Sequence, residues 1–428
     1  MAHDCFAQCT PGLEGVLAGE VAALGVRAVK ADRGGVGFRA TTRQVYAANV
    51  WLRSANRVLL RVAAFPARTW DQLEAGAATV DWWRFLGPGA PAAFRVSSSS
   101  SKLYHTEAIA ERLGRVVSAA VPPRRPDGRA ERRARHLQGA GPPRRSSQPP
   151  APPGSPPGAA RGAGPVTEGA LVVARVLRDR VVLSVDTSGE PLHRRGWRQQ
   201  TARAPLRETL AAAVVLASGW DAASPLVDPF CGSGTIAIEA ALVARDLAPG
   251  RDRGFAFQAW PTFEAGTWAS VRGEVAARAR PLHAGASIAG ADRDAGAVEA
   301  ARANAARAGV AEDVSFGRAS ISDLVPPAAR SSAPPGRSAG DAPGGWLVTN
   351  PPYGGRASAG HDLRDLYARL GDVARDRLRG WRAALLVADT RLAAQARLGL
   401  AEQLRTANGG LDVRLLVADI PGLAPLPG

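Results

Sequence analysis

The sequence predicts an α/β protein in two parts, an N-terminal α+β region followed by a doubly wound α/β sheet. Three observations support this prediction. Strand-like and helix-like runs alternate from residue 205 to the end of the chain. The first 65 residues follow the order β-α-β-β-α-β. Between the two parts, helix and strand patterns continue on either side of a stretch rich in proline, glycine and arginine.

The N-terminal elements are short and well separated. A strand at residues 4–9 precedes a helix that Pro11 opens and Gly25 ends, with apolar residues at helical spacing between them. Strands at 26–30 and 36–39 flank the Gly34-Gly35 turn, and a helix at 42–54 leads to a strand at 58–62. This order is the ferredoxin-like pattern, which we assign to residues 1–65. It specifies a fold and no function.

Residues 66–190 continue with helices and strands around one insertion. Expected are a helix from Thr69, a strand at 94–98, a helix at 105–121 and strands at 170–176 and 181–185. The cluster Trp82-Trp83-Arg84-Phe85 is typical of an amphipathic core, although its rings could also stack on bases.

The insertion at residues 122–165 holds twelve prolines and seven glycines, and Leu137 is its only large aliphatic or aromatic residue. It cannot bury a core, so we expect disorder. It also carries nine arginines against two acidic residues, nearly half of the net charge of +16 that 54 basic and 38 acidic residues produce. Three interpretations stay open: a passive insertion, a phosphate contact, and a gene-model error. The bulk charge therefore supports an RNA partner only modestly.

Other compositional features exclude several classes. No apolar run approaches the ~18 residues that span a bilayer, and the N-terminus lacks the regions of a signal peptide. The three cysteines have no zinc spacing, and the six histidines do not cluster. We therefore expect a soluble, cytoplasmic protein without a metal site.

From residue 205 the pattern is that of a doubly wound sheet. Pro205 opens a helix that runs to Ser218. Strands are expected at 226–228, 287–291, 314–316, 346–348, 383–387 and 411–417, the last of which closes the sheet. A second Pro/Gly/Ser/Ala-rich stretch, 326–345, reads as a surface loop insertion in a domain that spans 191–428.

A glycine-rich turn joins the first of these strands to a helix, in the run Asp228-Pro-Phe-Cys-Gly-Ser-Gly-Thr235. Its glycines allow positive φ and a close backbone approach to a ligand at the helix N-terminus. A dinucleotide fingerprint would need glycine at Ala237, and a Walker A loop would need Gly-Lys-Ser/Thr, so neither motif is present. Asp228 would repel phosphate but suits an ammonium group. Asp292, at the end of the next strand, can take both hydroxyls of a ribose. A ligand with ribose and ammonium but no phosphate is S-adenosylmethionine.

The run Asn350-Pro351-Pro352-Tyr353 directly follows the apolar strand at 346–348. Prolines end the strand, so the Asn carboxamide and the Tyr ring project beyond the carboxyl end of the sheet, where α/β ligands bind. The carboxamide oxygen and the Pro351 carbonyl can accept both hydrogens of an exocyclic NH2, and the Tyr353 ring can stack on its heterocycle. An ordinary Asn-Pro turn is the alternative reading.

Together these motifs resemble the bacterial 23S ribosomal RNA guanine-N2-methyltransferases, class I S-adenosylmethionine-dependent enzymes with a ferredoxin-like and THUMP RNA-binding region. The stretches that match are 192–198, 204–208, 227–235, 290–294, 301–309 and 350–354. The resemblance implies a catalytic set of Asn350, Pro351, Pro352 and Tyr353. It implies a cofactor set of Pro205, Asp228, Pro229, Phe230, Cys231, Gly232, Ser233, Gly234, Thr235, Asp292, Arg293, Ser320 and Asn350. Ser320 stands where the family often has an acid near the adenine amine, and Asp323, three residues on, is the candidate to replace that acid.

The expected reaction is direct in-line methyl transfer to the N2 amine of a guanine in RNA, without a nucleophilic side chain or metal. Cys231 is expected to be a small buried filler. Arg194, Arg195 and Arg198 are the expected phosphate contacts, because ordered segments flank them. Alternatives are a transfer RNA substrate, amino-methylation of DNA, and a non-catalytic RNA-binding assembly factor.

Overall fold

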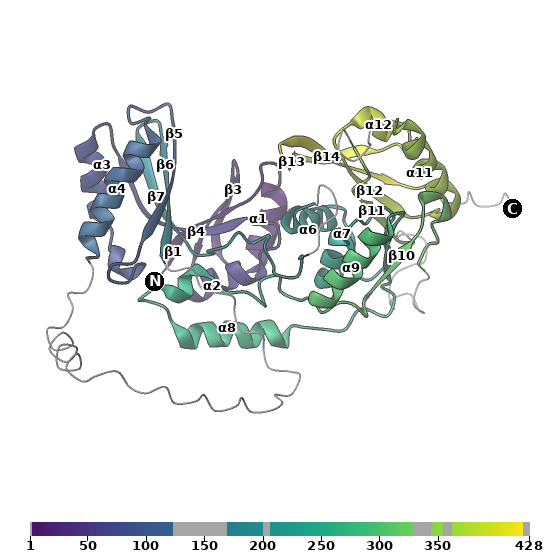
Figure 1. The fold of residues 1–428 in the computed structure, drawn as a ribbon, viewed down its shortest axis with the longest axis horizontal. Helices are drawn as coiled ribbons and strands as arrows, with labels where there is room; N and C mark the ends of the chain where they lie inside the picture. The colour runs from purple at the N-terminus through teal and green to yellow at the C-terminus, as the bar shows by residue number, and fades with distance from the viewer. Residues whose placement is uncertain (1, 123–168, 200–205, 328–343, 354–361, 423–428) are drawn as a thin grey trace, which may run out of the picture. The chain divides into compact units, whose positions relative to one another are not determined.

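The computed structural model describes residues 2–122, 169–199, 206–327, 344–353 and 362–422. It divides into two compact units (Figure 1). Unit 1 consists of Met1–Arg61, Asp186–Phe255 and Glu264–Gly428, and unit 2 consists of Val62–Val185 and Ala256–Phe263. Most of the insertions at 122–165 and 326–345 lies outside the described residues. Among the described helices, none has the length and apolar character that a membrane span requires.

The N-terminal part of unit 1 has the predicted ferredoxin-like order. Its elements are β1 (His3–Gln8), α1 (Glu14–Ala23), β2 (Arg27–Asp32), β3 (Gly35–Ala40), α2 (Thr42–Trp51) and β4 (Arg57–Pro66). The strands pair antiparallel in the order β2-β3-β1-β4. Cys5 and Ala7 on β1 alternate inward with no exposed surface. Thr41 begins α2 with a capping box, since its side chain accepts from the Gln44 N–H and Gln44 reaches back to the Thr41 N–H.

Unit 2 contains α3 (Trp70–Ala78), the 3-10 turn η1 (Trp82–Arg84), β5 (Ala92–Ser99), α4 (Thr106–Ala120), β6 (Ala170–Leu177) and β7 (Arg180–Asp186). Strand β5 pairs parallel with β6, and β6 pairs antiparallel with β7. Trp82 and Phe85 are buried as predicted for a core cluster, whereas Trp83 is exposed. The segment Ala256–Phe263 joins this unit, with the Trp260 ring edge-on to Phe85 at 5.0 Å between centroids.

The larger part of unit 1 is the predicted doubly wound sheet. Its strands are β8 (Leu226–Asp228), β9 (Ile288–Asp292), β10 (Val314–Arg318), β11 (Trp346–Thr349), β12 (Arg382–Val387), β13 (Ala401–Asn408) and β14 (Leu411–Asp419). They lie in the order β10-β9-β8-β11-β12-β14-β13, with β10 through β12 parallel and the last two antiparallel. The strand order reverses between β8 and β11, which is where ligands bind in open α/β sheets.

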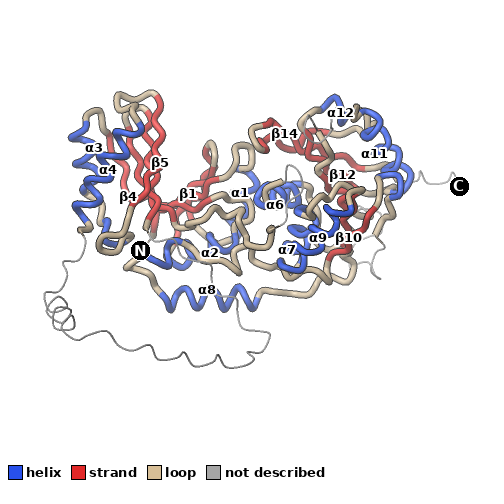
Figure 2. The backbone as a smooth tube through the Cα atoms, viewed as in Figure 1, coloured by secondary structure: helices blue, strands red, loops and turns tan. Residues whose placement is uncertain are grey.

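Helices cover both faces of this sheet. On one face lie α6 (Glu208–Ala217), α7 (Thr235–Ala244) and α9 (Ala295–Arg307), and on the other lie α11 (Arg364–Arg377) and α12 (Thr390–Ala394) (Figures 1 and 2). The connections also include η2 (Ala256–Ala259), α8 (Ala265–Ala277) and η3 (Ile321–Asp323). Helices α6 and α7 are apolar on most sides because they are buried between the sheet and other elements.

The edge of the sheet differs from the sequence prediction. The run 411–417 does form a strand, β14, but it does not close the sheet, because β13 pairs along its outer side. Strand β13 is mostly exposed and carries charged residues, so it lacks the apolar signature of a buried strand. Gly409 and Gly410, both at positive φ, form the hairpin turn between β13 and β14. A Gly-Gly pair between two runs is a hairpin signal and could have revealed β13.

Candidate functional site

Two polar side chains meet where the neighbouring strands β8 and β11 end. The Thr349 hydroxyl donates a hydrogen bond of 2.6 Å to the Asp228 carboxylate. Both residues are almost fully buried, with relative exposures of 0% and 1%. Burial raises the pKa of Asp228 to about 7, and the hydrogen bonds from Thr349 and the Phe230 N–H oppose that rise. Within the described part of the chain this buried carboxyl group has no cationic partner, and a ligand ammonium would provide one.

The glycine-rich loop between β8 and α7 needs its glycines. Gly232 and Gly234 have φ of 51° and 83°, in the left-handed region that favours glycine. A Cβ atom on Gly234 would lie 2.8 Å from the Phe316 ring and 2.9 Å from the Ala301 Cβ. The Phe316 ring therefore packs closely against the loop at Gly234. The loop ends at the N-terminus of α7, whose free N–H groups favour polar ligand atoms.

Asp292, at the end of β9, lies across this loop from Asp228. Its carboxylate accepts hydrogen bonds of 3.0 Å from the Gly232 N–H and the Asp294 N–H. Its negative charge is one of the causes that raise the pKa of Asp228. Two strand-end acids therefore flank one glycine-rich loop. This arrangement disfavours phosphate but provides partners for an ammonium and for ribose hydroxyls.

The remaining loop residues pack around the two acids. Pro229, Cys231, Ser233 and Thr235 are buried and Phe230 is half-buried. Burial and the nearby acids raise the pKa of the Cys231 thiol, which makes it a poor nucleophile and agrees with its interpretation as a packing residue.

Asn350 and Tyr353 follow β11 at the edge of the described residues. The Asn350 Oδ1 atom is buried and has no hydrogen-bond partner in the part of the chain that the structure describes. Buried acceptors are nearly always paired, so this oxygen is a candidate to receive an N–H from a ligand. The Tyr353 hydroxyl accepts a hydrogen bond of 2.9 Å from the Asn408 side chain, and Tyr367 donates 3.2 Å to the Pro352 carbonyl. These two bonds hold the turn in place.

Three further residues of the expected cofactor set, Ser320, Arg293 and Pro205, are not part of the buried loop. Ser320 is exposed just after β10, and its hydroxyl donates a 2.6 Å bond to Asp323. The two side chains therefore form one polar pair. Arg293 is exposed beside Asp292. Pro205 lies outside the described residues.

The expected phosphate contacts at residues 194–198 are largely contradicted by the structure. Arg195 is 3% exposed and forms an ion pair of 2.8 Å with Glu239, which is 0% exposed. The Arg198 guanidinium is mostly buried against Glu208 and the Leu206 carbonyl. Neither cation can reach a phosphate in this conformation. Arg194 is exposed and pairs only with the exposed Glu190, so its phosphate role stays a prediction.

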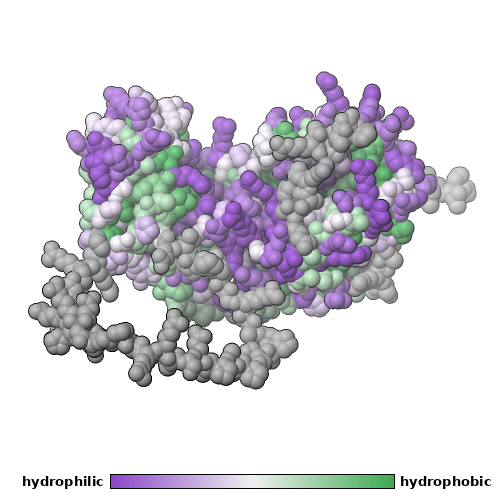
Figure 3. All heavy atoms as spheres, in the orientation of Figure 1, coloured by the Kyte–Doolittle hydropathy of each residue, from purple (hydrophilic) through white to green (hydrophobic). Residues whose placement is uncertain are grey.

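The sequence analysis missed several polar residues that shape the site. They are Thr349, Tyr367, Asn408, Glu239, Asn304 and Arg307. Thr349 directly precedes Asn350 at the end of a buried strand. A polar residue at that position of an apolar strand could have indicated that Thr349 belongs to the site. Among the described residues, no group of three or more His, Cys, Asp or Glu side chains could hold a metal ion. The visible face around α9 is mostly hydrophilic (Figure 3).

The fold and the paired strand-end acids define a class I methyltransferase. Residues 195–416 match the family of the RMKL-like methyltransferase domain, and residues 4–59 match the RlmL ferredoxin-like domain. The chain belongs to this RMKL-like methyltransferase family. Its sequence is 35% identical over 433 residues to the ribosomal RNA large subunit methyltransferase K/L of Syntrophotalea carbinolica. The matched region covers 97% of this chain and 53% of that protein.

Solved structures agree with this assignment. The crystal structure of SMU.472 complexed with SAH has a TM-score of 0.76 and 28% identity, and covers 99% of both chains. A predicted N6-adenine-specific DNA methylase from Listeria monocytogenes has a TM-score of 0.74 and 29% identity over 97% of this chain and 96% of that one. SAH is the demethylated form of S-adenosylmethionine, the cofactor that the sequence predicts for this chain. The chain spans about half the length of the curated relatives it matches.

Proposed function

We propose that the chain methylates the exocyclic N2 amine of a guanine in RNA, most specifically 23S ribosomal RNA, in the cytoplasm where that RNA is made. The observation that carries the proposal is the buried Asn350 Oδ1 at the strand end beside Asp228 and Thr349, which has no hydrogen-bond partner among the described residues. It is a preformed acceptor for an amine N–H. The curated relatives are named ribosomal RNA large subunit methyltransferase K/L, and this name supports the RNA substrate.

The cofactor side of the site uses the two acids. In the proposal Asp228 faces the ammonium of S-adenosylmethionine, Asp292 its ribose, and the Gly232–Gly234 backbone its methionine portion. The Ser320–Asp323 pair is placed to receive the adenine amine, because Ser320 follows β10 and the preceding Ala319 N–H donates 3.1 Å to the Asp292 carbonyl. Arg293, exposed beside Asp292, and Pro205, which lies outside the described residues, complete the proposed cofactor set. Bound S-adenosylmethionine supplies a methyl group already activated by its sulfonium charge.

The substrate side positions the amine. Asn350 Oδ1 and the Pro351 carbonyl accept its two hydrogens, which draws the nitrogen lone pair out of conjugation with the ring. Tyr353 stacks on the base, while Asn408 and Tyr367 hold Tyr353 and Pro352 in position. A carboxamide oxygen is not a base. After the N–C bond forms and the C–S bond breaks, Asn350 therefore orients the excess proton of the amine, and water takes it.

The RNA is proposed to bind through the ferredoxin-like domain and through residues 66–190 as a THUMP-type domain. A transfer RNA substrate would use the same chemistry, and a non-catalytic assembly role would leave the Asn350 acceptor without a purpose. Amino-methylation of DNA is the second candidate, which the name of the Listeria monocytogenes structure favours. We rank it below RNA because residues 4–59 match a domain of the ribosomal RNA enzymes.

The test is transfer of labelled methyl to total RNA and to DNA from cells that lack the gene, followed by nucleoside chromatography. Label in N2-methylguanosine of large ribosomal RNA is the expected result. Label in transfer RNA would move the substrate, and label in DNA would refute the RNA assignment. The Asn350→Ala variant should lose roughly 30- to 1000-fold in turnover, equivalent to about 2–4 kcal/mol, as on removal of one preorganised polar contact. Wild-type turnover in this variant would refute the mechanism.

A further inference from the structure

The segment Leu192–Arg198, which we call the latch, carries the buried arginine that the sequence suggested for RNA contact. Its sequence is Leu-His-Arg-Arg-Gly-Trp-Arg. Leu192, Arg195 and Trp197 are buried, and Gly196 adopts φ of 90°, which strains any other residue. In the chain the latch follows β7 and precedes α6, and it contacts both the ferredoxin-like domain and the rest of the methyltransferase domain. Its buried polar groups make contacts on both sides.

On the ferredoxin-like side, the latch donates hydrogen bonds to two backbone carbonyls. The Leu192 N–H donates 2.9 Å to the Asn56 carbonyl. The Arg195 guanidinium donates 2.7 Å to the Arg53 carbonyl. The latch is therefore anchored to the loop between α2 and β4.

On the methyltransferase side, a first set of hydrogen bonds, which we call the first route, connects the latch and Arg53 to helix α7. Arg195 Nη1 donates 2.8 Å to Glu239 Oε2, in the second turn of the helix that begins after the glycine-rich loop. Arg53 donates 3.2 Å to the carbonyl of Leu242, in the last turn of the same helix, and 2.8 Å to the carbonyl of Leu247, just after the helix ends. The axial position of α7 is thus set by two arginines from outside the sheet.

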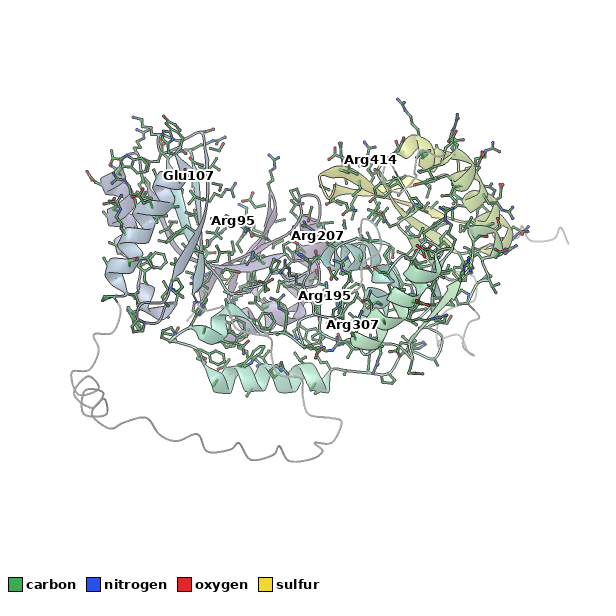
Figure 4. All side chains as sticks on the ribbon, in the orientation of Figure 1. Arg95, Glu107, Arg195, Arg207, Arg307 and Arg414 are labelled. Atoms are coloured by element: carbon green, nitrogen blue, oxygen red, sulfur yellow. The ribbon has the colours of Figure 1, made fainter. Side chains whose placement is uncertain are left out.

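A second route leads to the loop itself. Arg307 Nε donates 2.8 Å to the Trp197 carbonyl of the latch, and Arg307 also donates to Asn304 Oδ1 one turn earlier on α9. Asn304 Nδ2 then donates 3.1 Å to the Ser233 carbonyl. The N–H of the same peptide, on Gly234, donates 2.8 Å to the Cys231 carbonyl. The Ser233–Gly234 peptide is therefore held at both ends. Figure 4 labels Arg195 and Arg307 on the two routes.

The first route is not built for stability alone. Arg53 Nη1, Arg195 Nε and Glu239 Oε1 are buried and have no hydrogen-bond partner among the described residues. Desolvation raises the pKa of Glu239 and lowers that of Arg53. Burial of apolar residues of similar volume would cost less desolvation free energy than burial of this incompletely paired network. What the ion pair adds over an apolar contact is a defined position for α7.

We infer that the latch positions the cofactor loop, with Arg195, Arg307 and Asn304 as positioning residues that do not touch the cofactor. The inference rests on the proposed placement of S-adenosylmethionine over Gly232–Gly234. Loss of Arg307 removes one of the hydrogen bonds that orient the Asn304 carboxamide, so the Ser233 carbonyl is held less firmly and the loop samples conformations that cannot bind. Cofactor affinity then falls while the RNA surface is unchanged.

The experiment measures the Kd of SAH by calorimetry for the full chain, with RNA binding and the unfolding temperature measured in parallel. The Arg307→Ala variant should raise the Kd roughly tenfold, since it removes two hydrogen bonds. Glu299→Ala on the exposed face of the same helix, α9, is the matched control and should leave the Kd unchanged. Arg307→Lys keeps one donor and should give an intermediate Kd. For the first route, Arg195→Met should weaken SAH binding, and Arg194→Ala is its exposed neighbouring control.

Hydrogen exchange provides a readout that a general loss of stability would not reproduce. In the apo protein the peptide over residues 229–238 should exchange faster in Arg307→Ala than in Glu299→Ala, with peptides of the ferredoxin-like domain unchanged. If Arg307→Ala does not fold, Arg307→Lys and Asn304→Ala carry the same test. An unchanged Kd in the folded variants, or an equal rise in Glu299→Ala, would overturn the inference. Failure of the wild-type chain to bind SAH would refute the proposed cofactor site itself.

Discussion

Replacement of Thr349 by Val should shift the pH dependence of cofactor binding. The substitution keeps the shape of the side chain but removes the 2.6 Å hydrogen bond that the hydroxyl donates to Asp228. A hydrogen bond to a charged group contributes about 1.5–3 kcal/mol, and one pKa unit corresponds to ~1.4 kcal/mol. The pKa of Asp228, about 7 in the intact protein, should therefore rise to about 8 or 9 in the variant.

The sign of the effect follows from which form of Asp228 the ammonium of the cofactor requires. Only the carboxylate attracts it, so binding below the pKa must first release a proton. In the intact protein affinity should fall as the pH drops through about 7. In Thr349→Val the decline should begin about one to two pH units higher, so that affinity at pH 7.5 is about 3- to 25-fold lower.

The assay is calorimetric titration with SAH from pH 6 to pH 9, in two buffers with different ionisation enthalpies. The buffer dependence of the heat counts the protons released on binding. The Thr349→Ser variant retains the hydroxyl and serves as the control. If Thr349→Val showed the same midpoint as the intact protein, Asp228 would not be the group that receives the ammonium.

Three further predictions concern the same site. Asp228→Asn should abolish cofactor binding yet raise the unfolding temperature at pH 8. The folded protein alone holds a proton on Asp228 between pH 3.8 and about 7, so the buried carboxylate costs stability above that range. An unchanged or lower temperature would contradict this. Gly234→Ala should reduce SAH affinity at least tenfold through its clash with Phe316 and its positive φ; Gly266→Ala, which meets no neighbour, is the control. Asn408→Ala, checked by steady-state kinetics, should raise the KM for RNA with SAH affinity unchanged, because it frees the Tyr353 ring. A loss of SAH affinity instead would place Asn408 in the cofactor site.

Helix α8 and strand β13 are two elements that hydrophobic periodicity in the sequence does not predict. In α8 only Val271 and Val275 are buried, so its apolar spacing is too sparse to stand out. Strand β13 is an edge strand whose side chains are mostly exposed. Its contribution to the site is Asn408, which lies 55 residues from Tyr353 in the chain. No local pattern links the two.

The sequence alone determined the features that depend on residues close together in the chain. The β-α-β-β-α-β order, the parallel strands and the glycine-rich turn all follow from local periodicity and from backbone conformations that only some residues adopt. The strand-end positions of Asp228, Asp292 and Asn350 follow as well, because the carboxyl ends of parallel strands lie at one edge of the sheet.

Only the tertiary structure decided what surrounds those side chains. A cluster of arginines at residues 194–198 looks the same in a sequence whether it faces solvent or a buried acid. Glu239 lies 44 residues from Arg195, and Thr349 lies 121 residues from Asp228. Whether a charge is exposed or paired depends on which distant elements pack over it. For that reason the sequence predicted the glycine-rich turn between a strand and a helix, and the structure alone identified Arg195 as an internal ion-pair partner.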